Sequence, residues 1–201
     1  HNRSCSMKTS RRFSCVLLLC AFANLLSLTV RAQTHTILHT FGTNVMGQYP
    51  HSALVQGPDG TLYGTASAGG VANMGQVFKL NSDGTGYTAL RDFSGLDGAW
   101  PEAGLVMSGS TLYGSTAGGG TNDNGIVFKL NTDGTGFAVI CQFADWVNGA
   151  NPRGLILSGS TLYGTTEGGG LGNGTVFKVE ADGSGFSLLK RFAADEGALP
   201  Y

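Results

Sequence analysis

Two tryptophans stand close to acidic residues in a chain of which only 12% is charged. Trp100 precedes Glu102 by two positions, and Asp145 is followed directly by Trp146, with Arg153 further along the chain. An indole ring offers a flat apolar face together with one polar N–H group. A tryptophan beside an acid is typical of a carbohydrate-binding platform, so these five residues form the candidate ligand site. Tryptophans packed between structural units would give the same pattern.

Two acidic residues beside glycine-rich segments could form a carboxylate pair. Asp123 and Glu167 are of the type that glycoside hydrolysis uses as acid and base. They stand at different offsets in the sequence pattern, which favours chance placement over a catalytic pair. Cys141 has no histidine beside it in the pattern, and we interpret it as an incidental thiol near solvent. We therefore predict no catalytic residue.

Residue types that ligate metals also occur, without the spacing of a metal site. Histidines stand at positions 35, 39 and 51, on a stretch expected to form a strand, where a separation of four residues gives no helical ligand pair. The Asn-x-Asp-Gly-x-Gly sequences at Asn81 and Asn131 resemble the start of a calcium loop, but they are too short to supply the remaining ligands. We interpret them as hairpin turns and predict no metal and no cofactor.

The beginning of the chain predicts export. Basic residues follow Met7 and precede an apolar run at positions 13–30, which ends in Val-Arg-Ala at 30–32. This order is typical of a secretory signal peptide, with cleavage after Ala32. Residues 1–32 are therefore expected to be upstream residues and signal peptide, and the protein to be extracellular or on the cell surface. An uncleaved membrane anchor is the alternative, because a run of this length is near the lower limit for spanning a bilayer.

The remaining chain is acidic and nearly free of cysteine. Seven of the 12 basic residues and all 13 acidic residues follow Ala32, which gives a net charge of −6. Nucleic acid is therefore not expected as a partner. Only Cys141 remains after cleavage, so an internal disulfide framework is excluded. We expect no stable membrane insertion of the residues after Ala32.

The same sequence elements return at a period of about 50 residues. Thr-Leu-Tyr-Gly begins at positions 61, 111 and 161, Val-Phe-Lys at 77, 127 and 176, and Asp-Gly at 83, 133 and 182. A phenylalanine closes each unit at 93, 143 and 192. Regular spacing of this kind is the signature of a repeat architecture. The phenylalanines and tyrosines shared by all units are expected to pack in the core.

Each unit predicts four short antiparallel strands. Glycine-rich or Asp-Gly turns separate apolar segments, and Asp-Gly is a strong hairpin signal. Four strands in about 50 residues correspond to one blade of a β-propeller, and a β-solenoid is the alternative. The predicted tandem-repeat domain covers residues 33–201. Its units span about 52–93, 103–143 and 154–192, and a lone strand at 36–42 resembles the fourth strand of a unit.

The predicted array is incomplete. Three blades cannot close a ring, because propellers typically contain about four to eight. No divergent final unit precedes Tyr201, so we expect the parent protein to be longer. The lone strand at 36–42 would then complete the last blade. The fragment by itself is expected to self-associate through open strand edges.

The sequences TLYGSTAGGG, GIVFKLNTDGTGF and TLYGTTEGGG resemble the GloVer-type tandem repeats of bacterial choice-of-anchor proteins. The resemblance spans residues 36–201. It implies an exported bacterial protein that a C-terminal anchor retains at the cell surface, and it implies no established catalytic activity. The expected anchor is not found in this sequence.

These observations favour a non-catalytic repeat scaffold that binds polysaccharide or protein at the cell surface. Function in repeat folds usually resides in loops that break the repeat. A fragment of an exported propeller enzyme acting on polysaccharide is one alternative, and such an enzyme would gather acids, bases or metal ligands at one rim. A purely structural surface array is another, and it predicts nearly identical loops in all units.

Overall fold

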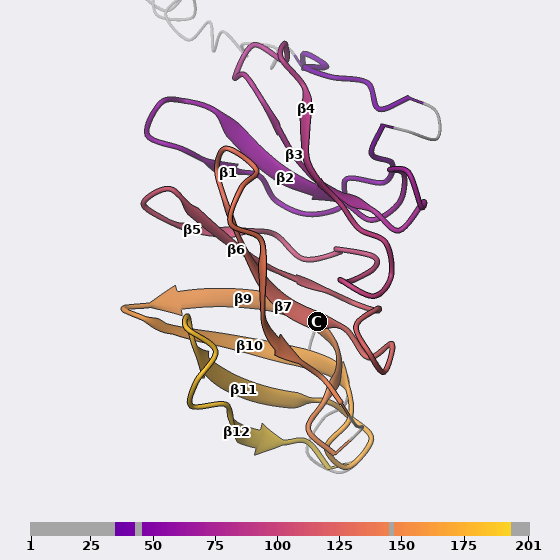
Figure 1. Cartoon of the computed structure of the whole chain (residues 1–201), viewed down its shortest axis with the longest axis vertical. Helices are drawn as coiled ribbons and strands as arrows, with labels where there is room; N and C mark the ends of the chain where they lie inside the picture. The colour runs from indigo at the N-terminus through magenta and orange to yellow at the C-terminus, as the bar shows by residue number, and fades with distance from the viewer. Residues whose placement is uncertain (1–34, 43–45, 145–146, 194–201) are drawn as a thin grey trace, which may run out of the picture. The chain divides into compact units, whose positions relative to one another are not determined.

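The computed structural model describes residues 35–42, 46–144 and 147–193. The chain divides into a unit of residues 1–36 and a compact unit of residues 37–201, and the account below concerns the second. Its described residues form three four-stranded sheets, here called blades 1, 2 and 3 (Figure 1). No helix occurs in these ranges, so none is long and apolar enough to cross a membrane. The predicted signal peptide and its cleavage site after Ala32 lie outside the described residues.

The strands of each blade are antiparallel and follow chain order across the sheet. Blade 1 contains β1 (Val55–Gln56), β2 (Leu62–Ala66), β3 (Gln76–Leu80) and β4 (Thr88–Asp92). Blade 2 contains β5 (Val106–Ser108), β6 (Thr111–Thr116), β7 (Ile126–Asn131) and β8 (Ala138–Gln142). Blade 3 contains β9 (Ala150–Ser158), β10 (Thr161–Gly168), β11 (Thr175–Glu180) and β12 (Ser187–Arg191). The predicted four-stranded antiparallel blades are confirmed.

The Asp-Gly sequences form hairpin turns, as predicted. In blade 1 the Gly84 N–H donates to the Asn81 carbonyl at 2.9 Å, and Gly84 has a φ of 87°, a conformation that glycine adopts without strain. The Asp83 carboxylate accepts hydrogen bonds from the Thr85 backbone N–H and hydroxyl. These bonds lower the pKa of Asp83 below its ordinary value. The aspartate oxygens are thus used to hold the turn.

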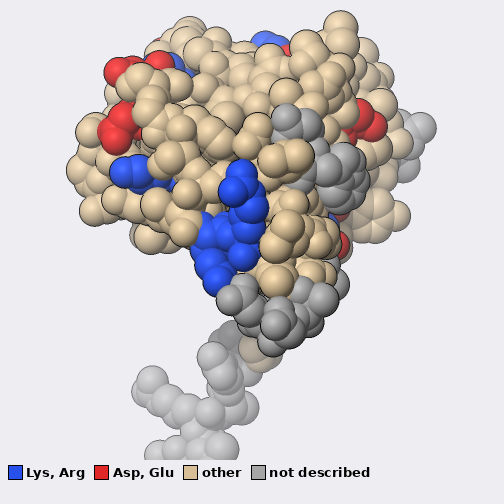
Figure 2. Space-filling view, turned by 90° about the horizontal axis from the view of Figure 1, so that it is seen from below, with Lys and Arg blue, Asp and Glu red and all other residues tan. Residues whose placement is uncertain are grey.

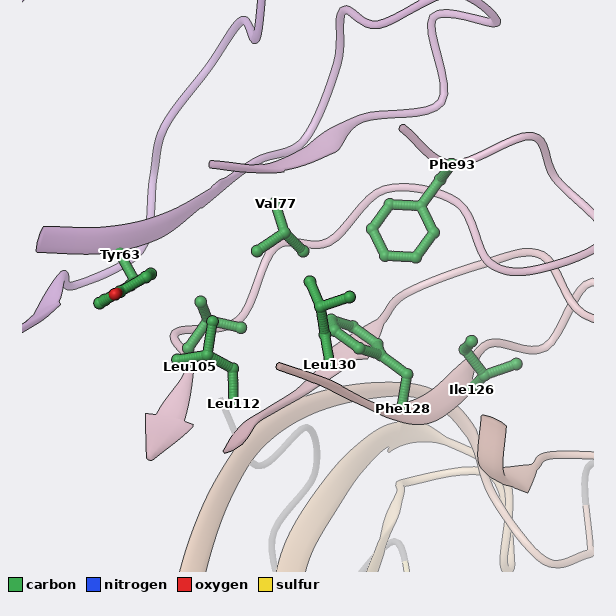
Figure 3. Packing of buried hydrophobic residues seen from close by; sticks show 8 residues of the cluster. All are labelled: Tyr63, Val77, Phe93, Leu105, Leu112, Ile126, Phe128 and Leu130. Atoms are coloured by element: carbon green, nitrogen blue, oxygen red, sulfur yellow. The ribbon is translucent and has the colours of Figure 1, made fainter. Parts of the chain in front are cut away.

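The core lies between neighbouring blades (Figure 3). Tyr63, Val77 and Phe93 of blade 1 face Leu105 and Phe128 of blade 2, within one buried cluster. Alternation along a strand sends successive side chains to opposite faces of a sheet. Each blade therefore has two faces of different composition, and blade 2 buries both of them, because a second cluster repeats the arrangement between blades 2 and 3. The shared phenylalanines of the third strands are 0–1% exposed, as expected for core residues.

The lone strand predicted at 36–42 is not formed. Residues 35–42 have no strand conformation, although the Phe41 ring packs on blade 1, with its centroid 5.2 Å from that of Phe78 and 5.8 Å from that of Tyr87. A strand requires a hydrogen-bonded neighbour. A fourth strand pairs with the third strand of its blade. In blade 1 the third strand is β3, which already pairs with β2 and β4, so the segment has no strand there to pair with. The segment keeps the side-chain contacts of a fourth strand without its backbone pairing.

Candidate binding site

The segment between blades 1 and 2 fixes Trp100 between the β2–β3 loop of blade 1 and the β6–β7 loop of blade 2. The Trp100 N–H donates to the Met74 carbonyl of blade 1 at 2.9 Å, and its carbonyl accepts from the Ala117 N–H of blade 2 at 2.9 Å. Its φ of 56° is unusual for a residue with a side chain. The indole lies over Gly118, where a Cβ atom would come within 2.6 Å of the ring. The residue is nevertheless 43% exposed, so the position serves both inter-blade packing and an accessible aromatic surface.

Three charged residues gather between blades 2 and 3. The Arg153 guanidinium forms ion pairs with Glu102 and with Glu167. Its Nε also donates to the Glu167 carboxylate at 2.8 Å. We call Glu102, Arg153 and Glu167 the Arg153 cluster. The structure thus brings two of the predicted site residues, Glu102 and Arg153, together with Glu167, whose position in the sequence pattern favours chance placement.

The Arg153 cluster is open to solvent on one side. Its three side chains are 27%, 39% and 25% exposed for Arg153, Glu102 and Glu167 respectively. Ion pairs at this exposure contribute only about 0–1 kcal/mol each to stability, so their main effect is to hold the arginine in one orientation. One guanidinium between two carboxylates leaves an excess negative charge. The cluster can therefore accept hydrogen bonds from hydroxyl groups and donate through the arginine.

The Arg153 cluster breaks the repeat. Each blade has a proline that follows a residue with positive φ, and these pairs are Tyr49-Pro50, Trp100-Pro101 and Asn151-Pro152. The residue after the proline is histidine in blade 1, glutamate in blade 2 and arginine in blade 3. Ala117 of blade 2 occupies the repeat position that corresponds to Glu167 of blade 3. Side chains that differ at equivalent positions are not required by the shared fold, and they make this site unique among the described blades.

The other predicted site residues do not join this cluster. Asp145 and Trp146 lie outside the described residues. The Asp123 carboxylate accepts a hydrogen bond from the Gly119 N–H at 2.8 Å and so holds its own loop, whereas Glu167 binds Arg153. The two carboxylates therefore have separate structural roles. The sequence does contain a signal for Glu167, because a charged residue stands there at a repeat position where blade 2 has Ala117.

Two of the described histidines, His39 and His51, stack on aromatic rings. The His39 ring stacks on Tyr87 with centroids 4.8 Å apart, and His51 stacks on Tyr49 at 5.9 Å. Within the described ranges, no group of three or more His, Cys, Asp or Glu residues could hold a metal ion.

Cys141 is more covered than the sequence predicted. It lies on β8 and packs against the cluster between blades 2 and 3, which includes Phe186. Burial raises the pKa of its thiol from 9.0 to about 11. The charged residues at the equivalent positions of the other blades do not imply solvent exposure here, because blade 3 covers this part of β8.

Alkylation of Cys141 by iodoacetamide should be slow at pH 8. The thiolate is the reactive form, and a pKa raised from 9.0 to about 11 reduces its fraction roughly a hundredfold relative to the unfolded chain. Between these two pKa values the unfolded thiol ionises while the folded one keeps its proton, so this group lowers stability as pH rises through that window. Mass spectrometry of folded and urea-unfolded protein measures the two rates. Equal rates would contradict the coverage of the thiol.

Comparison with solved structures supports the propeller fold. A chain of the nidogen/laminin complex superposes with a TM-score of 0.53 and 19% identity, over 71% of this chain and 47% of that chain. A TolB candidate from Agrobacterium tumefaciens gives a TM-score of 0.53 and 14% identity, over 78% of this chain and 53% of that one. Both are β-propellers, so the fold is an open β-propeller-like array rather than a solenoid. The chain spans about half the length of either structure.

Sequence comparisons identify the repeat family of the chain. No curated protein matches the chain significantly. The repeat described as Gloeobacter/Verrucomicrobia repeat matches residues 23–201, which include all three blades and the segment before them. The predicted resemblance is thereby confirmed, and the chain belongs to the Gloeobacter/Verrucomicrobia repeat family.

Proposed function

We propose that this protein is an exported, non-catalytic repeat scaffold that binds polysaccharide at the cell surface. The binding site consists of Trp100 and the Arg153 cluster. The observation that carries the proposal is the ion-paired contact of Glu102, Arg153 and Glu167, at positions where the repeat itself requires no charge. The repeat family and the propeller fold support a scaffold, and the apolar run at 13–30 supports export.

The site offers the two kinds of contact that a sugar uses. The exposed face of Trp100 can stack on the apolar face of a pyranose ring. The carboxylates of Glu102 and Glu167 accept hydrogen bonds from sugar hydroxyls, and the guanidinium of Arg153 donates to ring or hydroxyl oxygens. The ion pairs preorganise these groups, which reduces the ordering that binding would otherwise require.

Two other functions remain as alternatives. Two carboxylates on one arginine would also serve an exported propeller enzyme acting on polysaccharide, because glycoside hydrolysis employs a pair of acids. A purely structural array would bind no polysaccharide. Measurements of binding and of reducing-end release distinguish these functions, since an enzyme releases reducing ends, a binding scaffold retains the polymer intact, and a structural array does neither.

Replacing Trp100 with alanine should weaken polysaccharide binding at least about tenfold, because the stacking surface is lost. The full chain is produced in an exporting bacterium, and the recovered protein is expected to begin at Gln33. Affinity electrophoresis with soluble β-glucan, xylan and dextran measures binding, and a reducing-sugar assay runs in parallel.

Leu171→Ala provides the matched control, because Leu171 is an apolar residue of blade 3 that is 68% exposed outside the proposed site. It should bind as the unmodified protein does. Loss of binding in Arg153→Ala with retention in Leu171→Ala would support the site. Absence of binding to every polysaccharide would overturn the proposal, and release of reducing ends would replace it with the enzyme.

A further inference from the structure

Trp100 and Glu102 are exposed at the start of blade 2, which packs against a described blade on each side. The whole of Trp100 is 43% exposed and the side chain of Glu102 is 39% exposed. Burial alternates along this segment, because Pro101 and Ala103 are buried. The exposure of the indole and of the carboxylate therefore does not come from an end of the array.

Arg153 uses the same oxygen of each carboxylate in its cluster. Its Nη1 contacts Oε2 of Glu102, and its Nε and Nη2 contact Oε2 of Glu167. Within the described ranges, Oε1 of either glutamate accepts no hydrogen bond. An ionised carboxylate offers about two acceptor sites on each oxygen. Both glutamates therefore keep an acceptor oxygen for a ligand.

The Arg153 cluster keeps a negative charge, because two carboxylates share one guanidinium. The other basic residues of blade 3 are carried by β11 and β12, and Figure 2, which views the molecule from the blade 3 end, shows Lys and Arg side chains gathered there. The chain after Ala32 has a net charge of −6, which adds a long-range attraction for cations. The cluster is therefore expected to attract positively charged groups.

A third carboxylate lies near the indole. A Cβ atom at Gly118 would come within 2.6 Å of the Trp100 ring and 3.4 Å from Oδ1 of Asp123. The same Oδ1 accepts a hydrogen bond from the Gly119 N–H at 2.8 Å, and this amide is neutral, so the bond leaves the carboxylate charge uncompensated. The face of an indole attracts cations, and nearby carboxylates add to that attraction.

We propose that the polysaccharide bound at this site carries positively charged amino groups, as a polymer of de-N-acetylated glucosamine does. This inference rests on the proposed function and names the ligand class of the same site. A pyranose ring of the polymer stacks on Trp100, and its ammonium group donates hydrogen bonds to Oε1 of Glu102. A neutral sugar makes only the stacking contact and uncharged hydrogen bonds. An acidic sugar is repelled by the carboxylates.

A lysine-rich peptide carries the same charge as the amino sugar, but it has no pyranose ring. The carboxylates alone would attract either ligand. The exposed indole favours the sugar, because the flat apolar face of the indole matches that of a pyranose ring over a larger area than a lysine side chain covers.

Isothermal titration calorimetry compares a hexamer of glucosamine with a hexamer of N-acetylglucosamine, on the full chain recovered from an exporting bacterium. The two ligands have the same rings and linkages and differ in charge at about pH 6, where free amino groups are protonated. The glucosamine hexamer should bind at least about tenfold more tightly at low ionic strength. The difference should shrink at about 1 M salt, where the Debye length is only about 3 Å.

Glu102→Gln keeps the shape of the side chain and removes its charge. It should weaken binding of the glucosamine hexamer at least about tenfold and leave binding of the N-acetylglucosamine hexamer within about twofold. Glu167→Gln should act in the same direction, so a folding defect in one variant still leaves the other. Circular dichroism establishes which variants are folded.

Glu180→Gln is the matched control. Glu180 lies on β11 and accepts hydrogen bonds from the hydroxyl groups of Ser160 and Thr161, not from Arg153. The substitution changes the net charge of the chain by the same amount as Glu102→Gln does. It should bind both hexamers as the unmodified protein does.

Equal binding of the two hexamers would overturn the inference and leave polysaccharide binding intact. Equal weakening by Glu102→Gln and Glu180→Gln would also overturn it, since the net charge of the chain and not the site would then attract the ligand. Binding of hexalysine as tight as that of the glucosamine hexamer would assign the site to a basic peptide instead. Absence of binding to both hexamers and to β-glucan, xylan and dextran would overturn the proposed function itself.

Discussion

Replacing Phe128 with alanine should lower the free energy of unfolding by about 3–5 kcal/mol, the range observed for buried phenylalanines. Phe128 is fully buried on β7, between blades 1 and 2. Its ring lies 5.3 Å from that of Phe93 and 5.9 Å from that of Phe137, measured between centroids. A cavity at this position removes contacts in both blades at once. Urea unfolding followed by circular dichroism measures the change.

Leu171→Ala serves as the control for this measurement, because a side chain that is 68% exposed contributes little to packing. Its effect should stay within about 0.5 kcal/mol. An equally small effect for Phe128→Ala would contradict a core located between the blades. Loss of only blade 1 structure in the variant would show that the inter-blade contact unfolds before the sheets do.

Gly125→Ala should destabilise the protein by about 3 kcal/mol, because it combines backbone strain with overpacking. Gly125 has a φ of 89°, which a side chain disfavours. A Cβ atom there would lie 2.3 Å from the Thr116 carbonyl oxygen and 2.6 Å from Cδ of Pro152. The substitution therefore pushes blade 3 away from blade 2. Thermal unfolding monitored by calorimetry measures the loss.

Gly109→Ala separates the two causes. Gly109 also has a positive φ, of 58°, but no atom lies within 4 Å of the position that its Cβ would take. The strain alone should then cost about 1 kcal/mol. The difference between the two variants gives the combined contribution of the close contacts with the Thr116 carbonyl and with Pro152. Equal losses would mean that the close packing of Gly125 against Thr116 and Pro152 does not matter for stability.

The repeat fold was predictable because its signals are local. Turn residues such as Asp83 and Gly84 dictate a hairpin through their own backbone and side-chain bonds, so each unit reveals its strands without reference to distant residues. The phenylalanine of each third strand is an apolar residue in an apolar strand. Its burial follows from alternation along the strand.

The candidate site was only partly predictable, because it depends on contacts between repeats. Arg153 and Glu102 were selected as departures from the repeat, yet their ion pair joins residues that only blade packing brings together. Glu167 was dismissed because its partner was sought in Asp123 rather than in Arg153. The lone strand at 36–42 was predicted from sequence similarity to fourth strands. Sequence similarity to a fourth strand does not show whether a third strand is available for backbone pairing, and in blade 1 β3 already pairs with β2 and β4.

The two faces of a blade differ in composition, and this has a consequence for how such genes change. Every blade carries tyrosine and valine on one face and phenylalanine and leucine on the other, so any blade fits behind any other. Duplication or loss of one unit of about 50 codons then creates no new kind of interface. Recombination can alter the number of units in a single step, while point mutation changes individual positions such as Trp100, before blade 2, and Arg153, on β9, independently. The number of blades and the side chains at these two positions can therefore change separately.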